Sequence, residues 1–448
     1  MPRRVRVESP DVFVHPLSYV RAQMGWTYQD VVDVIARRAG NMARRREKAW
    51  RWEHWGVVPD RVSQRALAVE LGIPEECIDR YPWPQWLPDG DPIRTDFTWN
   101  QAGSSKAICD AMECTVTDRR GFMKLTGTSL IAFAQRWLDI EPAELASVLR
   151  GGRITEDFVD RVEEGLPRLR LLEATYGGRR SRRLIDAELG MVAEVLENSS
   201  YTASLSQRLH GLAAELGRMV GFACFDAGLH TAAQRYWVAA VHASHAAGQR
   251  ALGANILKSM SLQCHDFGRV REALALARNA NEGAGKTTPR VRSMLALREA
   301  RAHAALDDAV TCERLIARAD TEIGRGSRDD DPPWVAYFDE AEFHAQAGIC
   351  YLDLGDHRTA DRHFTRALDQ LAPSKVRDRA TYLIKRSEAQ AGLGAVDHAK
   401  ELLTTAIPLI QQAPSQRNAD RVFAARTGMP LPRRDSHDID EQLVLLVK

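Results

Sequence analysis

A chain of 448 residues with a net charge of +1 has room for several domains, and its overall charge gives no indication of a nucleic-acid partner. Hydrophobic residues make up 44% and charged residues 27%, as in ordinary globular proteins, and no apolar run reaches the roughly 18–20 residues that span a bilayer. The seven cysteines are odd in number and include no CxxC pair, which excludes a disulfide scaffold and favours a cytoplasmic location without a secretory signal.

Positive charge is concentrated at the N-terminus. Residues 1–58 contain eleven Arg and Lys side chains against six Asp and Glu side chains, which leaves +5 on this segment. A local excess of this kind is the electrostatic footprint that phosphate binding requires.

Residues 15–80 contain the start and stop signals of short helices. Pro16 suits the first position of a helix, and Thr27 can cap a second helix with Asp30 as its partner. Gly40 breaks the pattern, and Asn41 can cap the third helix. We predict helices over 16–24, from 27 onward, over 41–55 and over 60–71.

The third predicted helix carries a cluster of cations and three tryptophans. Because Arg44, Lys48 and Arg51 recur at spacings of four and three, they share one face of a helix. Trp52 is expected to pack inward with Val31, Ile35 and Leu67. The candidate DNA contacts are Arg44, Arg45, Arg46, Lys48 and Arg51, and the tryptophans expected to anchor the opposite side are Trp50, Trp52 and Trp55.

Two interpretations of this helix stay open. A run of charges is commonly a solvated face with no partner. A single-sign cationic face that follows two shorter helices is also typical of a helix that enters the major groove of DNA. The cations here are nearly all of one sign, which favours the second interpretation.

The rest of the chain divides by composition. Residues 1–14 are expected to form a flexible tail, 81–127 a Pro/Gly-rich linker, 128–205 connecting helices and 412–448 a C-terminal tail. Asp118-Arg119-Arg120-Gly121-Phe122, inside the linker, looks like a twin-arginine export motif, but it lies too deep in the chain to be one.

Residues 206–411 contain an internal repeat. Gly228, Gly268, Asp307, Gly355 and Gly394 recur as turns at spacings of 40, 39, 48 and 39. Small residues recur in register at Ala233, Ala273, Cys312, Ala360 and Ala399, and again at Ala240, Ala280, Ala319, Ala367 and Ala406. Small residues in register let paired helices approach closely, so we predict a tetratricopeptide (TPR)-like right-handed superhelix, with a plain helical bundle as the alternative.

Candidate chemical sites are weak. The segment 280–287 ends in Gly-Lys-Thr but falls between two repeat helices instead of after a strand, so we expect an ordinary loop and not a phosphate-binding loop. His242 and His245 share a helix face, but no zinc-binding spacing accompanies them. We therefore predict an all-α protein that is not an enzyme, with no catalytic residues, cofactor or metal.

Several stretches resemble a known family. Thr27-Tyr28-Gln29-Asp30-Val31, Trp52-Glu53 with Gly56, and Leu67-Ala68 with Leu71-Gly72-Ile73 resemble the Xre-type helix-turn-helix of Cro and phage repressors. The interval from Thr27 to Trp52 is longer than in that pattern, so the second helix or the turn after it should be extended. His15-Pro16-Leu17, the segment 50–59 and Asp118 to Phe122 make the layout similar to actinobacterial regulators with an Xre-type head and a TPR-like body.

This resemblance implies a cytoplasmic transcriptional regulator that binds double-stranded DNA as a homodimer, in some members to control sporulation or antibiotic production. By similarity to the peptide-pheromone receptors of Gram-positive bacteria, the TPR groove is expected to bind a peptide or small-molecule ligand. The alternative is a TPR protein-interaction adaptor that does not bind DNA.

Overall fold

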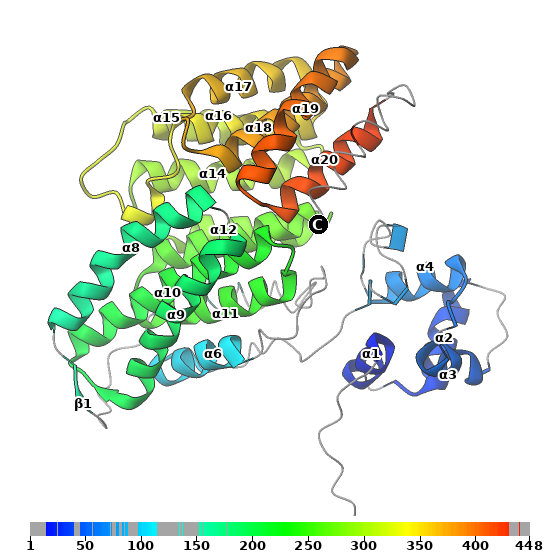
Figure 1. Cartoon of the computed structure of the whole chain (residues 1–448), viewed down its shortest axis with the longest axis horizontal. Helices are drawn as coiled ribbons and strands as arrows, with labels where there is room; N and C mark the ends of the chain where they lie inside the picture. The colour runs from blue at the N-terminus through cyan, green and yellow to red at the C-terminus, as the bar shows by residue number, and fades with distance from the viewer. Residues whose placement is uncertain are drawn as a thin grey trace, which may run out of the picture. The chain divides into compact units, whose positions relative to one another are not determined.

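The computed structural model divides into two compact units. Unit 1 comprises residues 1–93 and 116–126, and unit 2 comprises residues 94–115 and 127–448. The structure describes residues 15–24, 26–39, 45–55, 57–71, 73, 78–79, 83–84, 86–87, 97–113, 134, 137, 152–154, 156–176, 178–429 and 439. These are helical apart from loops and one short parallel pairing of β1 (Gly152–Arg153) with β2 (Ser199–Ser200), so the predicted all-α class is confirmed (Figure 1).

Unit 1 includes four described helices, and side-chain caps begin two of them. They are α1 (Pro16–Met24), α2 (Tyr28–Ala39), α3 (Glu47–His54) and α4 (Arg61–Glu70). The Thr27 N–H donates to Asp30 Oδ2 at 2.7 Å and the Asp30 N–H donates to Thr27 Oγ1 at 3.2 Å, which confirms the predicted capping box. Asp60 caps α4 by accepting the Ser63 N–H at 2.8 Å.

The core of unit 1 forms where α1, α2, α3 and α4 meet. Val31 and Ile35 of α2 and Leu67 of α4 are fully buried, and Trp52 of α3 is only 5% exposed. The Trp52 ring meets Trp83 edge to face at 6.3 Å between ring centroids. Aromatic packing therefore joins α3 to the segment that follows α4.

Unit 2 is built mainly from helical hairpins. Its described helices are α6 (Gln101–Glu113), α8 (Glu156–Tyr176), α9 (Gly178–Asn198), α10 (Ala203–Asp226), α11 (His230–Ala246), α12 (Arg250–Asp266), α13 (Val270–Gly283), α14 (Pro289–Ala304), α15 (Ala309–Ile323), the 3₁₀ turn η2 (Pro333–Val335), α16 (Glu340–Asp353), α17 (His357–Gln370), α18 (Val376–Gly392), α19 (Val396–Gln412) and α20 (Gln416–Gly428). From α10 to α19, each even-numbered helix packs on the next one in the chain. Every described helix is too short or too polar to span a bilayer.

The hairpins depend on turns and small residues at the predicted positions. Gly228, Gly268, Asp307, Gly355 and Gly394 all have positive φ, between 58° and 80°. Both predicted rows of small residues are completely or almost completely buried. At Gly348, an added Cβ would lie 3.0 Å from the Phe364 ring, so α16 and α17 approach too closely there for a larger residue.

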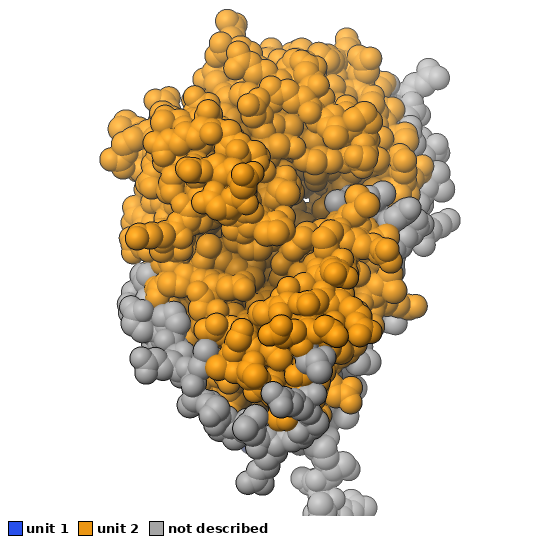
Figure 2. Space-filling view, turned by 90° about the vertical axis from the view of Figure 1, so that its left-hand side faces the viewer, with its two compact units in different colours: residues 1–93, 116–126 blue, residues 94–115, 127–448 orange. Residues whose placement is uncertain are grey.

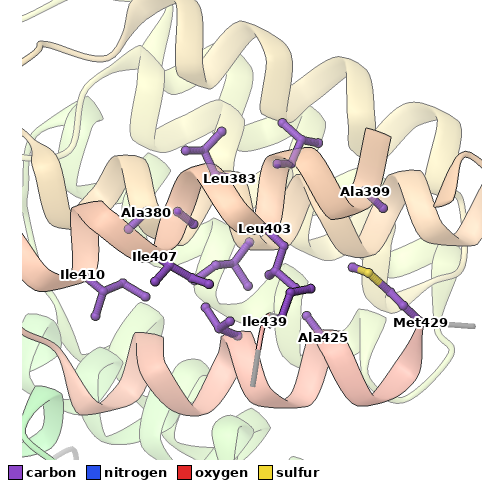
Figure 3. Close-up of a cluster of buried hydrophobic side chains, with 13 residues drawn as sticks. Ala380, Leu383, Ala399, Leu403, Ile407, Ile410, Ala425, Met429 and Ile439 are labelled. Carbon is purple, nitrogen blue, oxygen red and sulfur yellow. The ribbon is translucent and has the colours of Figure 1, made fainter. Parts of the chain in front are cut away.

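Two predicted irregular segments contain helices. α6 falls inside the predicted 81–127 linker, yet it belongs to unit 2, packs on α9 and α11, and buries Ala107 and Ile108. α20 falls inside the predicted 412–448 tail; Ser415 caps it, and it packs on α18 and α19. In Figure 3, α20 contributes Ala425 to the same apolar cluster as Leu403 and Ile407 of α19. The helices α6 and α20 are therefore parts of the core of unit 2, and not linker or tail.

The turn geometry predicts opposite effects of two glycine substitutions in unit 2. Gly355 has φ +76° and open space around it, so Gly355→Ala should lower the free energy of unfolding by about 1 kcal/mol through backbone strain alone. Gly165 lies inside α8 with open space around it and an ordinary helical backbone, so Gly165→Ala should raise the free energy of unfolding by about 0.5–1 kcal/mol. Urea unfolding followed by circular dichroism measures both, and changes of equal sign would contradict the assignment of the turn.

Candidate nucleic-acid interface and ligand cavity

A buried ion pair holds α3 in place within unit 1. Arg21 of α1 donates to both carboxylate oxygens of Glu53, from Nε at 2.8 Å and from Nη2 at 2.9 Å. The Tyr28 hydroxyl donates to Glu53 Oε1 at 3.1 Å, and the Arg21 guanidinium lies 3.8 Å from the centre of the Tyr28 ring. Because the Glu53 side chain is only 7% exposed, this bidentate pair fixes α3 against α1 and α2 more firmly than a surface ion pair could.

The candidate cations lie at or just before the start of α3. Arg45, Arg46 and Arg51 are exposed and Lys48 is half-buried, while Arg44 lies outside the described residues. Arg46 Nε lies 3.8 Å from a Glu47 carboxylate oxygen. Arg45, Lys48 and Arg51 form no ion pair with any carboxylate among the residues that the structure describes.

The helix that presents these cations is shorter than predicted. α3 begins at Glu47, and the preceding turn is closed by hydrogen bonds from Lys48 N–H to the Arg45 carbonyl at 3.0 Å and from Trp50 N–H to the Arg46 carbonyl at 3.1 Å. Arg45 and Arg46 therefore lie in this turn and not on the helix. The predicted cap, Asn41, lies outside the described residues.

The expectation that three tryptophans anchor the back of this helix is correct only for Trp52. Trp55 is 63% exposed and Trp50 is half-buried. The Trp50 ring stacks on His54 with 4.7 Å between centroids, and the Arg51 guanidinium lies 5.4 Å from the centre of the Trp55 ring. The outer surface of α3 is therefore both aromatic and cationic.

Helical spacing explains which tryptophan is buried. Ala49 and Trp52 are three residues apart and both are buried, so they define the inner face of α3. Trp50 and Trp55 do not lie on that face, and helical spacing predicts this once the face is defined. The contacts of Arg21 and Tyr28 with Glu53 could not be predicted from spacing, because these residues lie 32 and 25 positions from Glu53 along the chain.

Three other cations of unit 1, Arg37, Arg38 and Arg61, lie beside carboxylates. Arg38 of α2 pairs with Glu70 of α4 at 2.7 Å, and Arg37 lies 3.9 Å from the same carboxylate. Arg61 pairs with Asp79 at 2.7 Å. The pKa of Asp60 is lowered mainly by the hydrogen bond that its side chain accepts from the Ser63 N–H. The positive charge of Lys48 makes a smaller contribution to this lowering. The cations at the start of α3 thus differ in electrostatic setting from those around them.

A cavity of about 710 Å³ lies in unit 2 between α8, α10, the turn at 248–252, the loop at 284–286 and η2. Figure 2 shows unit 2 hollowed on the side that carries α8 in Figure 1. Arg170 and Arg208 line this cavity and pair with Glu215 at 2.6 Å and Glu163 at 2.8 Å. The volume is within the range of small-molecule sites, and the walls mix apolar and charged side chains.

The weak chemical motifs have ordinary structural settings. Lys286 is exposed in the loop between α13 and α14 and lines this cavity, as expected for a loop between helices. His242 and His245 are buried on α11, where the Trp99 ring stacks on His242 at 4.0 Å and meets His245 edge to face. Among the described residues, no group of three or more His, Cys, Asp or Glu side chains could hold a metal ion.

Comparison of the chain with protein-family models and with curated proteins finds no match in either.

Proposed function

We propose that the chain is a cytoplasmic, sequence-specific DNA-binding regulator of transcription. Unit 1 is then an Xre-type helix-turn-helix domain in which α2 and α3 form the motif, and α3 enters the major groove. The resemblance to actinobacterial regulators extends the proposal to the control of development or secondary metabolism, such as sporulation or antibiotic production.

The observation that carries this proposal is the set of unneutralised cations at α3. Arg45, Lys48 and Arg51 have no carboxylate partner among the described residues, whereas Arg37, Arg38 and Arg61 do. DNA phosphates would supply the missing anions, and guanidinium groups also suit hydrogen bonding to guanine in the major groove. The anchoring of α3 through Glu53 supplies the fixed orientation that base recognition needs.

The connection between α2 and α3 also supports the helix-turn-helix assignment. The resemblance requires an extended second helix or an extended turn. α2 ends at Ala39 and α3 begins at Glu47, so seven residues, 40–46, separate them. This separation agrees with the long interval from Thr27 to Trp52, and Trp52 is still packed in the core.

The structure of unit 2 supports a TPR-like body. Its hairpins have buried small residues and positive-φ turns at the positions of the sequence repeat. The cavity beside α8 and α10 offers a place for a peptide or small-molecule ligand.

Proteins of this helix-turn-helix class bind two-fold-symmetric sites, so we propose a homodimer. A ligand would switch DNA binding only by binding more tightly to one arrangement of the dimer than to another.

Removal of single cations should weaken DNA binding. We expect Arg51→Ala to lower the affinity for a cognate fragment about tenfold, because it removes a charge-assisted contact to a phosphate or a base. If the lost contact is to a phosphate, the slope of log affinity against log salt should become shallower by about 0.9. Arg45→Ala should behave in the same way. Mobility shifts on fragments recovered by chromatin enrichment measure both quantities.

Arg358→Ala is the matched control, because Arg358 is an exposed cation on α17 in unit 2. It should leave affinity and salt dependence unchanged. Unaltered binding by both α3 variants, or equal losses in all three, would contradict the assigned interface.

Glu53→Gln tests whether the orientation of α3 matters. This change removes a negative charge from the candidate interface, so simple electrostatics predicts tighter DNA binding. We expect weaker binding instead, with an unchanged salt slope, and a loss of about 1–2 kcal/mol in the stability of unit 1, because Arg21 would lose its ionic partner. Thermal unfolding measures the change in stability, and mobility shifts on the same protein sample measure the change in affinity for DNA. An increase in affinity would exclude a role for Glu53 in positioning α3.

A second candidate function has one observation in its favour. Trp55, Val58 and Val62, at the end of α3 and the start of α4, are each more than half exposed, with 63%, 61% and 57% of their surfaces accessible. An apolar surface of this kind suits a protein-docking module in a TPR adaptor that does not bind DNA. Chromatography on heparin separates the two functions, because an adaptor should flow through at low salt and a DNA-binding protein should be retained until moderate salt.

A further inference from the structure

Three cations of unit 2, two buried and one half-buried, form no ion pair with any carboxylate that the structure describes. Arg218 lies on α10, Lys258 on α12 and Arg298 on α14, and these helices pack on one another in that order (Figure 1). Lys258 is 8% exposed and Arg298 is 6% exposed. Lys258 reaches α14 through the Tyr337 hydroxyl, which also contacts Met294, one turn before Arg298. Burial, together with the positive charges of Arg298 and Arg218, holds the pKa of Lys258 well below its usual value.

Part of the hydrogen-bonding capacity of this cation cluster (Arg218, Lys258 and Arg298) is unused. Nε and Nη1 of Arg298 and Nε of Arg218 are buried and have no hydrogen-bond partner within the described part of the chain. Lys258 Nζ donates to the Tyr337 hydroxyl at 2.5 Å, and that hydroxyl donates to Met294 Sδ at 3.1 Å. A phenol hydroxyl accepts a hydrogen bond from the ammonium group but does not neutralise its charge.

Three of the neighbouring carboxylates are committed to other partners. Asp266 pairs with Arg417 at 2.7 Å and with Arg421 at 3.3 Å. Asp353 accepts a hydrogen bond from His265 at 3.0 Å. Glu342 accepts hydrogen bonds from the Tyr382 hydroxyl and from Gln346 Nε2, and its charge acts on Lys258 less than Arg298 and Arg218 do.

A folded protein rarely buries unpaired cations, because the charges lose their hydration and repel one another. A bound anion would remove both penalties at once. Two guanidinium groups and a lysine whose charged form a bound anion would favour call for a multiply charged anion. A phosphate group carries about −1.5 to −2 charges with three strong acceptor oxygens, whereas a carboxylate carries one charge. Guanidinium groups and a lysine are the usual protein partners of phosphate.

We propose that Arg218, Lys258, Arg298 and the Tyr337 hydroxyl form a binding site for a phosphate group, either free or carried by a small organic molecule. Arg298 and Lys258 supply the buried charges, and Tyr337 positions the ammonium group. The site belongs to unit 2 alone and does not depend on DNA binding by unit 1.

The first test is thermal unfolding of the full chain with millimolar inorganic phosphate, with chloride used to keep the ionic strength constant. Phosphate should raise the Tm by about 2–4 °C as the site saturates. Lys258→Met and Arg298→Met should abolish the shift and, in phosphate-free buffer, be at least as stable as the parent, because each removes an unpaired buried charge. Lys286→Met, which removes an exposed cation of the separate cavity beside α8, should keep the full shift.

The second test is isothermal titration with inorganic phosphate, phenyl phosphate and triglutamate. Each cluster variant should bind phosphate about tenfold to a hundredfold more weakly than the parent. Tighter binding of phenyl phosphate would identify an organic phosphate as the ligand, and equal binding would identify free phosphate. The proposal is overturned by the absence of a phosphate shift, by an equal shift in all variants, by binding of triglutamate alone, or by variants that are less stable than the parent without phosphate.

Discussion

The buried carboxylate of Glu53 is the interaction on which the candidate interface depends. It sits near the C-terminal end of α3 and is held by Arg21 of α1 and Tyr28 of α2, so one side chain joins three helices. Trp52, its neighbour in the chain, fills the core on the same inner face. With its inner face fixed in this way, α3 cannot rotate to hide Arg51. The exposure of that cation is therefore a consequence of packing.

In unit 2 the corresponding constraint is the close approach of paired helices. Alanine or cysteine in the two buried rows lets backbones come together, and a positive-φ residue forms the turn between the two helices of each hairpin. Repetition of this geometry places equivalent faces of α10, α12 and α14 side by side. Cations that are 40 residues apart in the chain, Arg218, Lys258 and Arg298, are thereby brought together.

The parts of the fold that follow from local chemistry were predictable from the sequence. Pro16, the Thr27–Asp30 capping box and the turn at Gly355 act on their own backbone, so their effects can be read without knowing the tertiary structure. α20 was missed because its buried stripe of Ala419, Val422 and Ala425 is small and its other residues are polar. Arg21 was missed because nothing in the spacing of 32 residues from Glu53 indicates that the two side chains meet.

Both proposed sites are argued from cations that have no carboxylate partner among the described residues. The free-energy cost of an unpaired cation depends on its burial, and burial differs between the two sites. At the start of α3, exposed cations such as Arg51 are hydrated, so leaving them unpaired costs little and a merely solvated face would look similar. In unit 2, Arg298 and Lys258 are buried, and the same absence costs far more. A fold that pairs Arg301, Arg417 and Arg421 with Asp266 nearby could have provided another carboxylate for the cluster. The unpaired charges in the interior are therefore the stronger physical argument for a ligand, although the sequence resemblance points first to α3.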